Sequence, residues 1–96
     1  MKPIISHTFR GKRYLIKNAR KGASFLGICD DPNWKGPKVV KIPMHGATLD
    51  ELDTILHEAS HACNWDLTEE AVNAFAQSTA RLLWRLGWRN SNYPAK

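Results

Sequence analysis

The spacing of apolar residues along the chain changes once, near Thr48. Before that point, short apolar or alternating runs are separated by turn residues, a pattern typical of strands. A turn at Gly11 and Lys12 separates the first two runs, and the segment 30–37 breaks the chain before the last one. The first half is therefore predicted to form a hairpin or meander with strands at Ile4–Phe9, Arg13–Lys17, Ala23–Cys29 and Lys38–Ile42.

After Thr48 the apolar period becomes 3.6, which indicates helices. A first helix is predicted over about 49–63, with Thr48 or Asp50 as its cap. Thr68 begins a second helix that ends at about residue 86, before Gly87. The second helix carries an apolar stripe of Val72, Phe75, Ala76, Thr79, Leu82, Leu83 and Leu86. The predicted fold class is α+β: a small twisted, mainly antiparallel sheet of three to four strands packed on two C-terminal helices.

Length and composition predict a single globular domain, because 96 residues with 43% hydrophobic and 24% charged side chains suffice for one core. The net charge is +5, and no Asp or Glu precedes Asp30. This cationic N-terminal third is what the solvated face of an ordinary strand looks like, and it also suits nucleic acid or an acidic protein segment. No nucleic-acid motif accompanies the charge, so nucleic acid is kept as an alternative partner.

Two cysteines, Cys29 and Cys63, are too few for a disulfide framework, and no apolar leader follows Lys2. We therefore expect reduced thiols in a cytoplasmic protein. No apolar run approaches the length needed to cross a bilayer, so no membrane association is expected. The protein is expected to be a monomer.

The chemical signal lies in the first predicted helix, where residues 57–61 read H-E-A-S-H, a match to the H-E-x-x-H motif. His57 and His61 are one helical turn apart, with about 5–6 Å between their Cβ atoms, so both can bind one Zn²⁺ at roughly 2.0–2.1 Å. Glu58 projects between them and can accept a proton from a metal-bound water. The pattern predicts zinc-dependent hydrolysis, with Glu58 as the general base.

A catalytic zinc needs a third protein ligand and an open fourth position. The downstream candidates are Asp66, Glu69 and Glu70. Glu69 flanks the apolar stripe of the second helix and can point towards the first helix, so it is the preferred ligand, with Glu70 as its main rival. Asn73, one turn after Glu69, is a candidate to orient a ligand histidine through a hydrogen bond. Acids in a first helical turn are also favoured by the helix dipole alone.

These residues resemble the gluzincin group of zincin metallopeptidases, in which H-E-x-x-H on one helix is completed by a Glu on the next. The layout is similar to minigluzincins, and residues 69–76, reading E-E-A-V-N-A-F-A, resemble the second helix of phage-immunity and radiation-response metallopeptidases. The resemblance covers about residues 49–86. It implies a peptidase acting on a peptide or protein substrate, with zinc held by His57, His61 and Glu69 and with Glu58 as the base.

Several features leave alternatives open. In zincins an edge strand holds the substrate, and Lys38–Ile42 is a candidate for that role or else an internal strand. His45 and Tyr93 are candidates to stabilise an oxyanion, each also an ordinary loop residue, and Trp65 lies in the turn beside the metal ligands.

Two other functions compete with the peptidase. In one, Cys29 and Cys63 join the histidines in a closed structural zinc site, although Cys63 points away from the His61 face. In the other, the chain is a non-catalytic, zincin-shaped regulator or binding module, such as a phage-type regulator, that uses its basic N-terminal sheet to bind nucleic acid or a protein partner.

Overall fold

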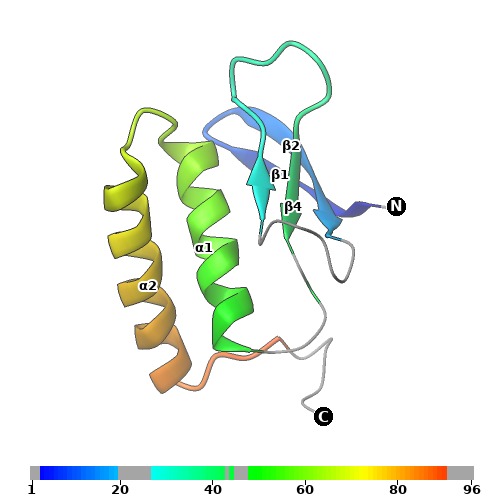
Figure 1. Cartoon of the computed structure of the whole chain (residues 1–96). Helices are drawn as coiled ribbons and strands as arrows, with labels where there is room; N and C mark the ends of the chain where they lie inside the picture. Colours follow the sequence, from blue (N-terminus) through cyan, green and yellow to red (C-terminus); the bar gives the residue numbers. More distant parts are fainter. Residues whose placement is uncertain (1–2, 20–26, 43, 45–47, 91–96) are drawn as a thin grey trace.

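The computed structural model describes residues 3–19, 27–42, 44 and 48–90. Within these residues four strands precede two helices, and Figure 1 shows how they are arranged. The strands are β1 (Pro3–Phe9), β2 (Lys12–Asn18), β3 (Ile28–Cys29) and β4 (Val39–Ile42), and the helices are α1 (Leu49–Cys63) and α2 (Glu69–Arg85). The predicted α+β class is confirmed. Of the strand predicted at Ala23–Cys29, residues 23–26 lie outside the described part of the chain.

The four strands form one mixed sheet in the order β1-β2-β4-β3. Two of the three pairings are antiparallel, and β2 pairs with β4 in parallel. The turn between β1 and β2 lies at Arg10 and Gly11, one residue earlier than predicted. Both have positive φ, 48° and 81°, as in the two-residue hairpin turns that match strand twist.

The strand order shows which of the described strands lie at an edge of the sheet and which lie inside it. Because β4 lies between β2 and β3, the candidate role of Lys38–Ile42 as a substrate-binding edge strand is wrong, and its alternative as an internal strand is confirmed. Among the described residues β3 is an edge strand, and it packs against α1.

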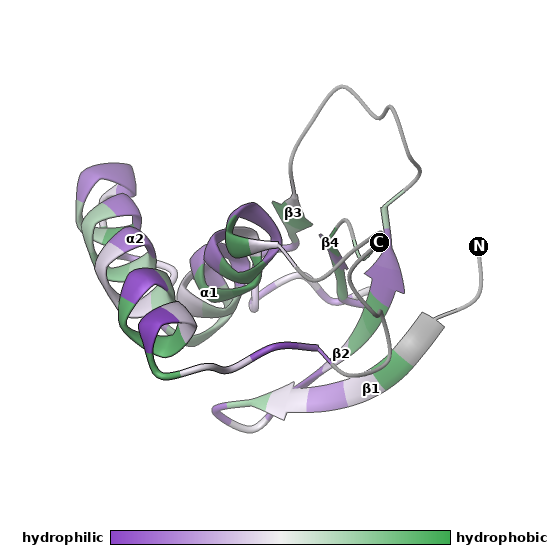
Figure 2. Ribbon diagram, turned by 90° about the horizontal axis from the view of Figure 1, so that it is seen from below, coloured by the Kyte–Doolittle hydropathy of each residue, from purple (hydrophilic) through white to green (hydrophobic). Residues whose placement is uncertain are grey.

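The layers are sheet, α1 and α2, with α1 between the curved sheet and α2 (Figure 2). Thr48 caps α1 by accepting a hydrogen bond from the Glu51 amide, and Thr68 caps α2 by accepting one from the Ala71 amide. The sheet contributes Tyr14, Ile16, Val40 and Ile42 to the core, and α1 contributes Ala62. Tyr14 also donates a hydrogen bond from its hydroxyl to the Asp30 carbonyl, 2.9 Å away, which ties the segment after β3 to the core.

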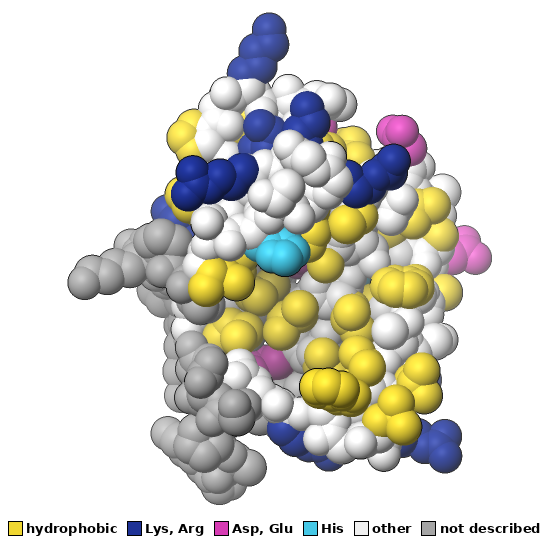
Figure 3. Space-filling model, turned by 180° about the vertical axis from the view of Figure 1, so that it is seen from behind, with side chains coloured by type: hydrophobic (Ala, Val, Ile, Leu, Met, Phe, Trp, Pro, Cys, Tyr) yellow, Lys and Arg dark blue, Asp and Glu magenta, His cyan; other side chains and the backbone are white. Residues whose placement is uncertain are grey.

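The second helix packs only on α1 among the described elements, through the small or branched residues Val72, Ala76 and Ala80. The apolar stripe predicted for α2 is wider than this contact, and Phe75, Leu82 and Leu86 remain 52%, 56% and 66% exposed. The stripe is not fully covered because α2 does not reach the sheet. The side of the molecule behind α1 consequently carries many hydrophobic side chains around a hollow (Figure 3).

No helix within the described ranges is long and apolar enough to cross a membrane.

Candidate metal centre

Three side chains from two helices converge at one end of the α1–α2 pair. The Nε2 atoms of His57 and His61 are 3.2 Å apart, and His57 Nε2 lies 3.5 Å from Glu69 Oε2. His61 Nε2 lies 2.5 Å from the other carboxylate oxygen of Glu69, Oε1. In tetrahedral coordination at about 2.0–2.1 Å, neighbouring ligand atoms lie roughly 3.4 Å apart. The group can therefore hold a metal ion with little rearrangement.

The chain places Glu69 by turning tightly after α1. The Asn64 amide donates to the Ser60 carbonyl at the end of α1, and the Leu67 amide donates to the Asn64 carbonyl at 3.0 Å. The Thr68 cap then starts α2, so Glu69 is the first residue of a helix that runs back along α1. This geometry brings Glu69 to the histidines.

The other sequence candidates in the second helix do not reach the site. Glu70 is exposed and does not belong to the group of metal-ligating side chains found among the described residues. Asn73 is exposed, and its side chain makes no hydrogen bond with another described residue, so the expected contact with a ligand histidine is not formed. Of the candidates there, only Glu69 takes part in the cluster.

Glu58 is the most enclosed acid of the site, with 6% of its surface exposed. Burial raises the pKa of its carboxyl group, the neighbouring His57 lowers it, and the charge of Glu69 raises it again. Its side chain faces the start of β3: a Cβ atom added to Gly27 would lie 2.8 Å from Glu58 Oε2 and 2.9 Å from its Cγ. The absence of a side chain at Gly27 allows the edge of the sheet to approach this carboxylate.

Gly27 is a contributor that the sequence analysis missed. A single glycine before a strand has many explanations, and its role depends on a contact with a helix 31 positions later. Trp65, singled out for its place in the turn, does lie against the site: its ring meets the His61 ring edge-on, with centroids 5.9 Å apart.

The two cysteines do not join the cluster. Cys29 borders the same hollow, but its Sγ donates to the Asp30 carbonyl at 3.4 Å. Burial, together with the nearby charge of Glu58, raises the pKa of the Cys29 thiol to about 12. The described residues therefore do not form a closed zinc site of two histidines and two cysteines. His45 and Tyr93, the candidates for oxyanion stabilisation, lie outside the described residues.

The cluster opens into a surface hollow of about 530 Å³. One wall is β3 with Gly27, and the others are the histidine face of α1, Trp65 and Glu69. A buried carboxylate, three side chains that could hold a metal ion and strand β3 thus border one cavity that is open to solvent.

Comparison with known proteins adds no relative: no family model, no curated protein and no solved structure matches the chain.

Proposed function

We propose that the chain is a zinc-dependent peptidase that hydrolyses peptide bonds with Glu58 as the general base. One observation carries the proposal: His57, His61 and Glu69 converge at separations suited to one metal ion, directly beside the buried carboxylate of Glu58.

The ligand set supports zinc as the metal. Two imidazoles and one carboxylate are the protein ligands of a known type of catalytic zinc site, which leaves the fourth position open. Zinc bound there supplies a Lewis acid that polarises the substrate carbonyl and lowers the pKa of a bound water. The resemblance of residues 57–69 to gluzincins supports the same assignment.

Glu58 supplies the proton transfers. Its carboxylate takes a proton from the attacking water as the water oxygen bonds to the carbonyl carbon, and passes it to the amine nitrogen as the C–N bond breaks. Burial favours the protonated form that exists between these two steps. Among the described residues β3 is the last strand on its side of the sheet, so its outer edge offers main-chain hydrogen-bonding groups to an extended peptide lying along the hollow.

Metal content and hydrolysis of a peptide library test the proposal, with a histidine outside the site as control. We expect about one zinc per chain, lost in His61→Ala and kept in Glu58→Gln, which hydrolyses nothing. His7→Ala, a substitution of the exposed histidine on β1, should keep both zinc and hydrolysis. Stoichiometric zinc in His61→Ala would overturn the metal site, and cleavage by Glu58→Gln at the wild-type rate would overturn the mechanism.

A second candidate function is a nucleic-acid-binding module, which the outer face of the sheet favours. Tyr14, Ile16, Val40 and Ile42 face the core, so the alternate residues Lys17 and Lys41, which pair across β2 and β4, face away. Arg13 lies on the same outer face. Oligonucleotide binding that falls steeply with salt and is lost in a Lys17→Glu, Lys41→Glu double variant would support this function.

For its location we propose the cytoplasm, because both cysteines are free thiols.

A further inference from the structure

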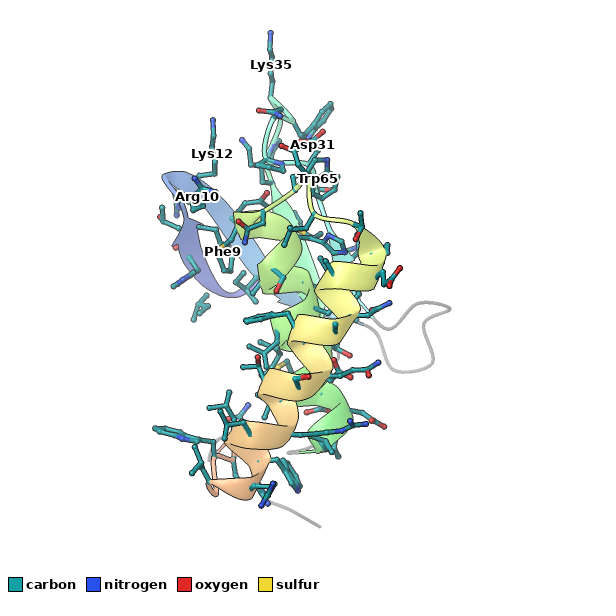
Figure 4. The ribbon with its side chains drawn as sticks, turned by 90° about the vertical axis from the view of Figure 1, so that its left-hand side faces the viewer. Phe9, Arg10, Lys12, Asp31, Lys35 and Trp65 are labelled. Carbon is teal, nitrogen blue, oxygen red and sulfur yellow. The ribbon has the colours of Figure 1, made fainter. Side chains whose placement is uncertain are left out.

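Trp65 stands between the metal hollow and a second hollow of about 440 Å³ at the end of α1. The walls of the second hollow come from the tip of the β1–β2 hairpin, the loop after β3, and the α1–α2 turn. Figure 4 shows Phe9, Arg10 and Lys12 of the hairpin at the same end of the molecule as Trp65 and Asp31. A polypeptide that leaves the metal site along β3 in the direction of Asp30 reaches this second hollow.

More positive than negative side chains surround this hollow, and they differ in whether another described residue binds them. Arg10 and Lys12 line it, with Asp66 as the acid on its wall, and Lys35 extends from the loop above it (Figure 4). Neither Lys12 nor Lys35 forms an ion pair with a carboxylate of the described residues. Asp31, the other nearby acid, accepts a hydrogen bond from the Asn33 amide at 2.8 Å.

Arg10 is held in place at this hollow. One of its guanidinium nitrogens donates to the Cys63 carbonyl at 3.0 Å, at the end of α1. A guanidinium has five N–H donors, so others remain for a ligand. Lys12 lies two residues further along the hairpin and adds a second positive charge to the same wall.

We propose that this hollow is a specificity subsite that binds an acidic side chain of the peptide substrate; the inference rests on the proposed peptidase function. Cys63 follows His57 and His61 by six and two residues, which at 1.5 Å per residue is about 9 and 3 Å along the helix axis. An extended peptide advances about 3.3 Å per residue. The acidic residue therefore sits about one to three positions from the cleaved bond.

A peptide fits this hollow better than a nucleic acid does. Two wall cations beside an acid, enclosed by Phe9 and Trp65, form a local pocket rather than the extended basic stripe that follows a phosphate backbone. The hollow also adjoins the cavity that holds the proposed metal ligands, because Trp65 lines both.

The test uses zinc-loaded protein and quenched fluorescent peptides that carry Glu, Gln or Lys at each of the three positions on either side of the cleaved bond. We expect Glu to be preferred over Lys about fivefold in kcat/KM on one side only, as an accessible charge pair allows. Lys12→Glu should reverse this preference. Arg81→Glu, which changes an exposed cation on α2 away from the hollow, should leave it unchanged.

A second measurement separates failure of the subsite from failure of the enzyme. Binding of the Glu and Lys peptides to Glu58→Gln protein should show the same preference, again reversed when Lys12→Glu is added. Cleavage without a charge preference would overturn the subsite and leave the peptidase standing. A Lys12-dependent binding preference without cleavage by the wild type would support the subsite and overturn the peptidase. Displacement of the acidic peptide by an oligonucleotide, with steep salt dependence, would assign the hollow to nucleic acid.

Discussion

The contact between Gly27 and Glu58 gives the sharpest test of how the sheet positions the proposed general base. In Gly27→Ala the new methyl group would lie 2.8 Å from Glu58 Oε2 and 2.8 Å from Thr54 Cγ2, far inside normal contact distance. Either β3 or the two side chains of α1 must move by more than half an ångström. The backbone at Gly27 is not in the left-handed region, so the effect is steric.

The clash should lower both the free energy of unfolding and kcat, by different amounts. Overpacking costs about 1–3 kcal/mol, and the smaller entropy of an unfolded chain with Ala offsets about 0.4–1 kcal/mol. A net loss of about 1–2 kcal/mol lowers the Tm by roughly 4–16 °C in a domain of this size. Displacement of the base by an ångström lowers kcat by as much as about a hundredfold. Zinc binding should survive, because the clash involves no proposed ligand.

The assay compares kcat, zinc content and Tm in Gly27→Ala and in a matched variant, Gly36→Ala. A Cβ at Gly36 would lie 2.6 Å from Trp34 Nε1, a still shorter contact, but Trp34 is 56% exposed and its ring can rotate into solvent. We expect Gly36→Ala to change the free energy of unfolding by less than about 0.5 kcal/mol and to leave kcat unchanged. Wild-type kcat and Tm in Gly27→Ala would refute the argument that β3 holds the base.

Four further predictions concern the helices, the thiols and the metal. Thr68→Ala removes the cap of α2 and should lower the free energy of unfolding by about 1 kcal/mol, measured by urea denaturation, and weaken zinc binding by loosening Glu69. Ala76→Leu overpacks the helix interface and should cost about 1–3 kcal/mol in the same assay, whereas the exposed Ala74→Leu should cost almost nothing. With a pKa of about 12, only about one Cys29 thiol in ten thousand is ionised at pH 8, so iodoacetamide should modify it far more slowly in folded than in urea-unfolded protein, measured by mass spectrometry. Chelation of zinc should speed hydrogen exchange in the first turns of α2, where Glu69 lies, and leave exchange in β2 and β4 unchanged. Equal acceleration in α2 and in these strands would contradict the expectation that the metal stabilises only the region around its ligands.

Those parts of the site that depend on local geometry could be predicted from the sequence. The i, i+4 spacing places His57 and His61 together wherever the segment is helical. The choice of Glu69 over Glu70 followed from helical phase, since neighbouring residues point about 100° apart. Both depend only on residues close in the chain, and the structure brings His57, His61 and Glu69 together.

Features that depend on distant contacts could not be predicted in this way. The hydropathy of Lys38–Ile42 fits an edge strand and an internal strand equally well, and only its parallel pairing with β2 makes it internal. Glu58, on the polar side of a helical wheel, is buried because β3 approaches α1 at Gly27. Likewise, Phe75 and Leu82 belong to an apolar stripe, but α2 packs on one helix instead of a sheet and leaves them exposed.

The candidate site is built from α1 and from its two neighbours, the sheet and α2. That helix carries two of the proposed ligands and the proposed base, so their mutual spacing is set by one rigid element. The segment before β3, through Gly27, encloses the carboxylate of Glu58, and α2, through its first residue, supplies the proposed third ligand. Among the described elements α2 packs on α1 alone, so contacts with the sheet do not fix the position of Glu69. The short turn after α1 and the Thr68 cap therefore determine where Glu69 lies relative to the two histidines. A substitution there should weaken metal binding more than it disturbs the packing of the core.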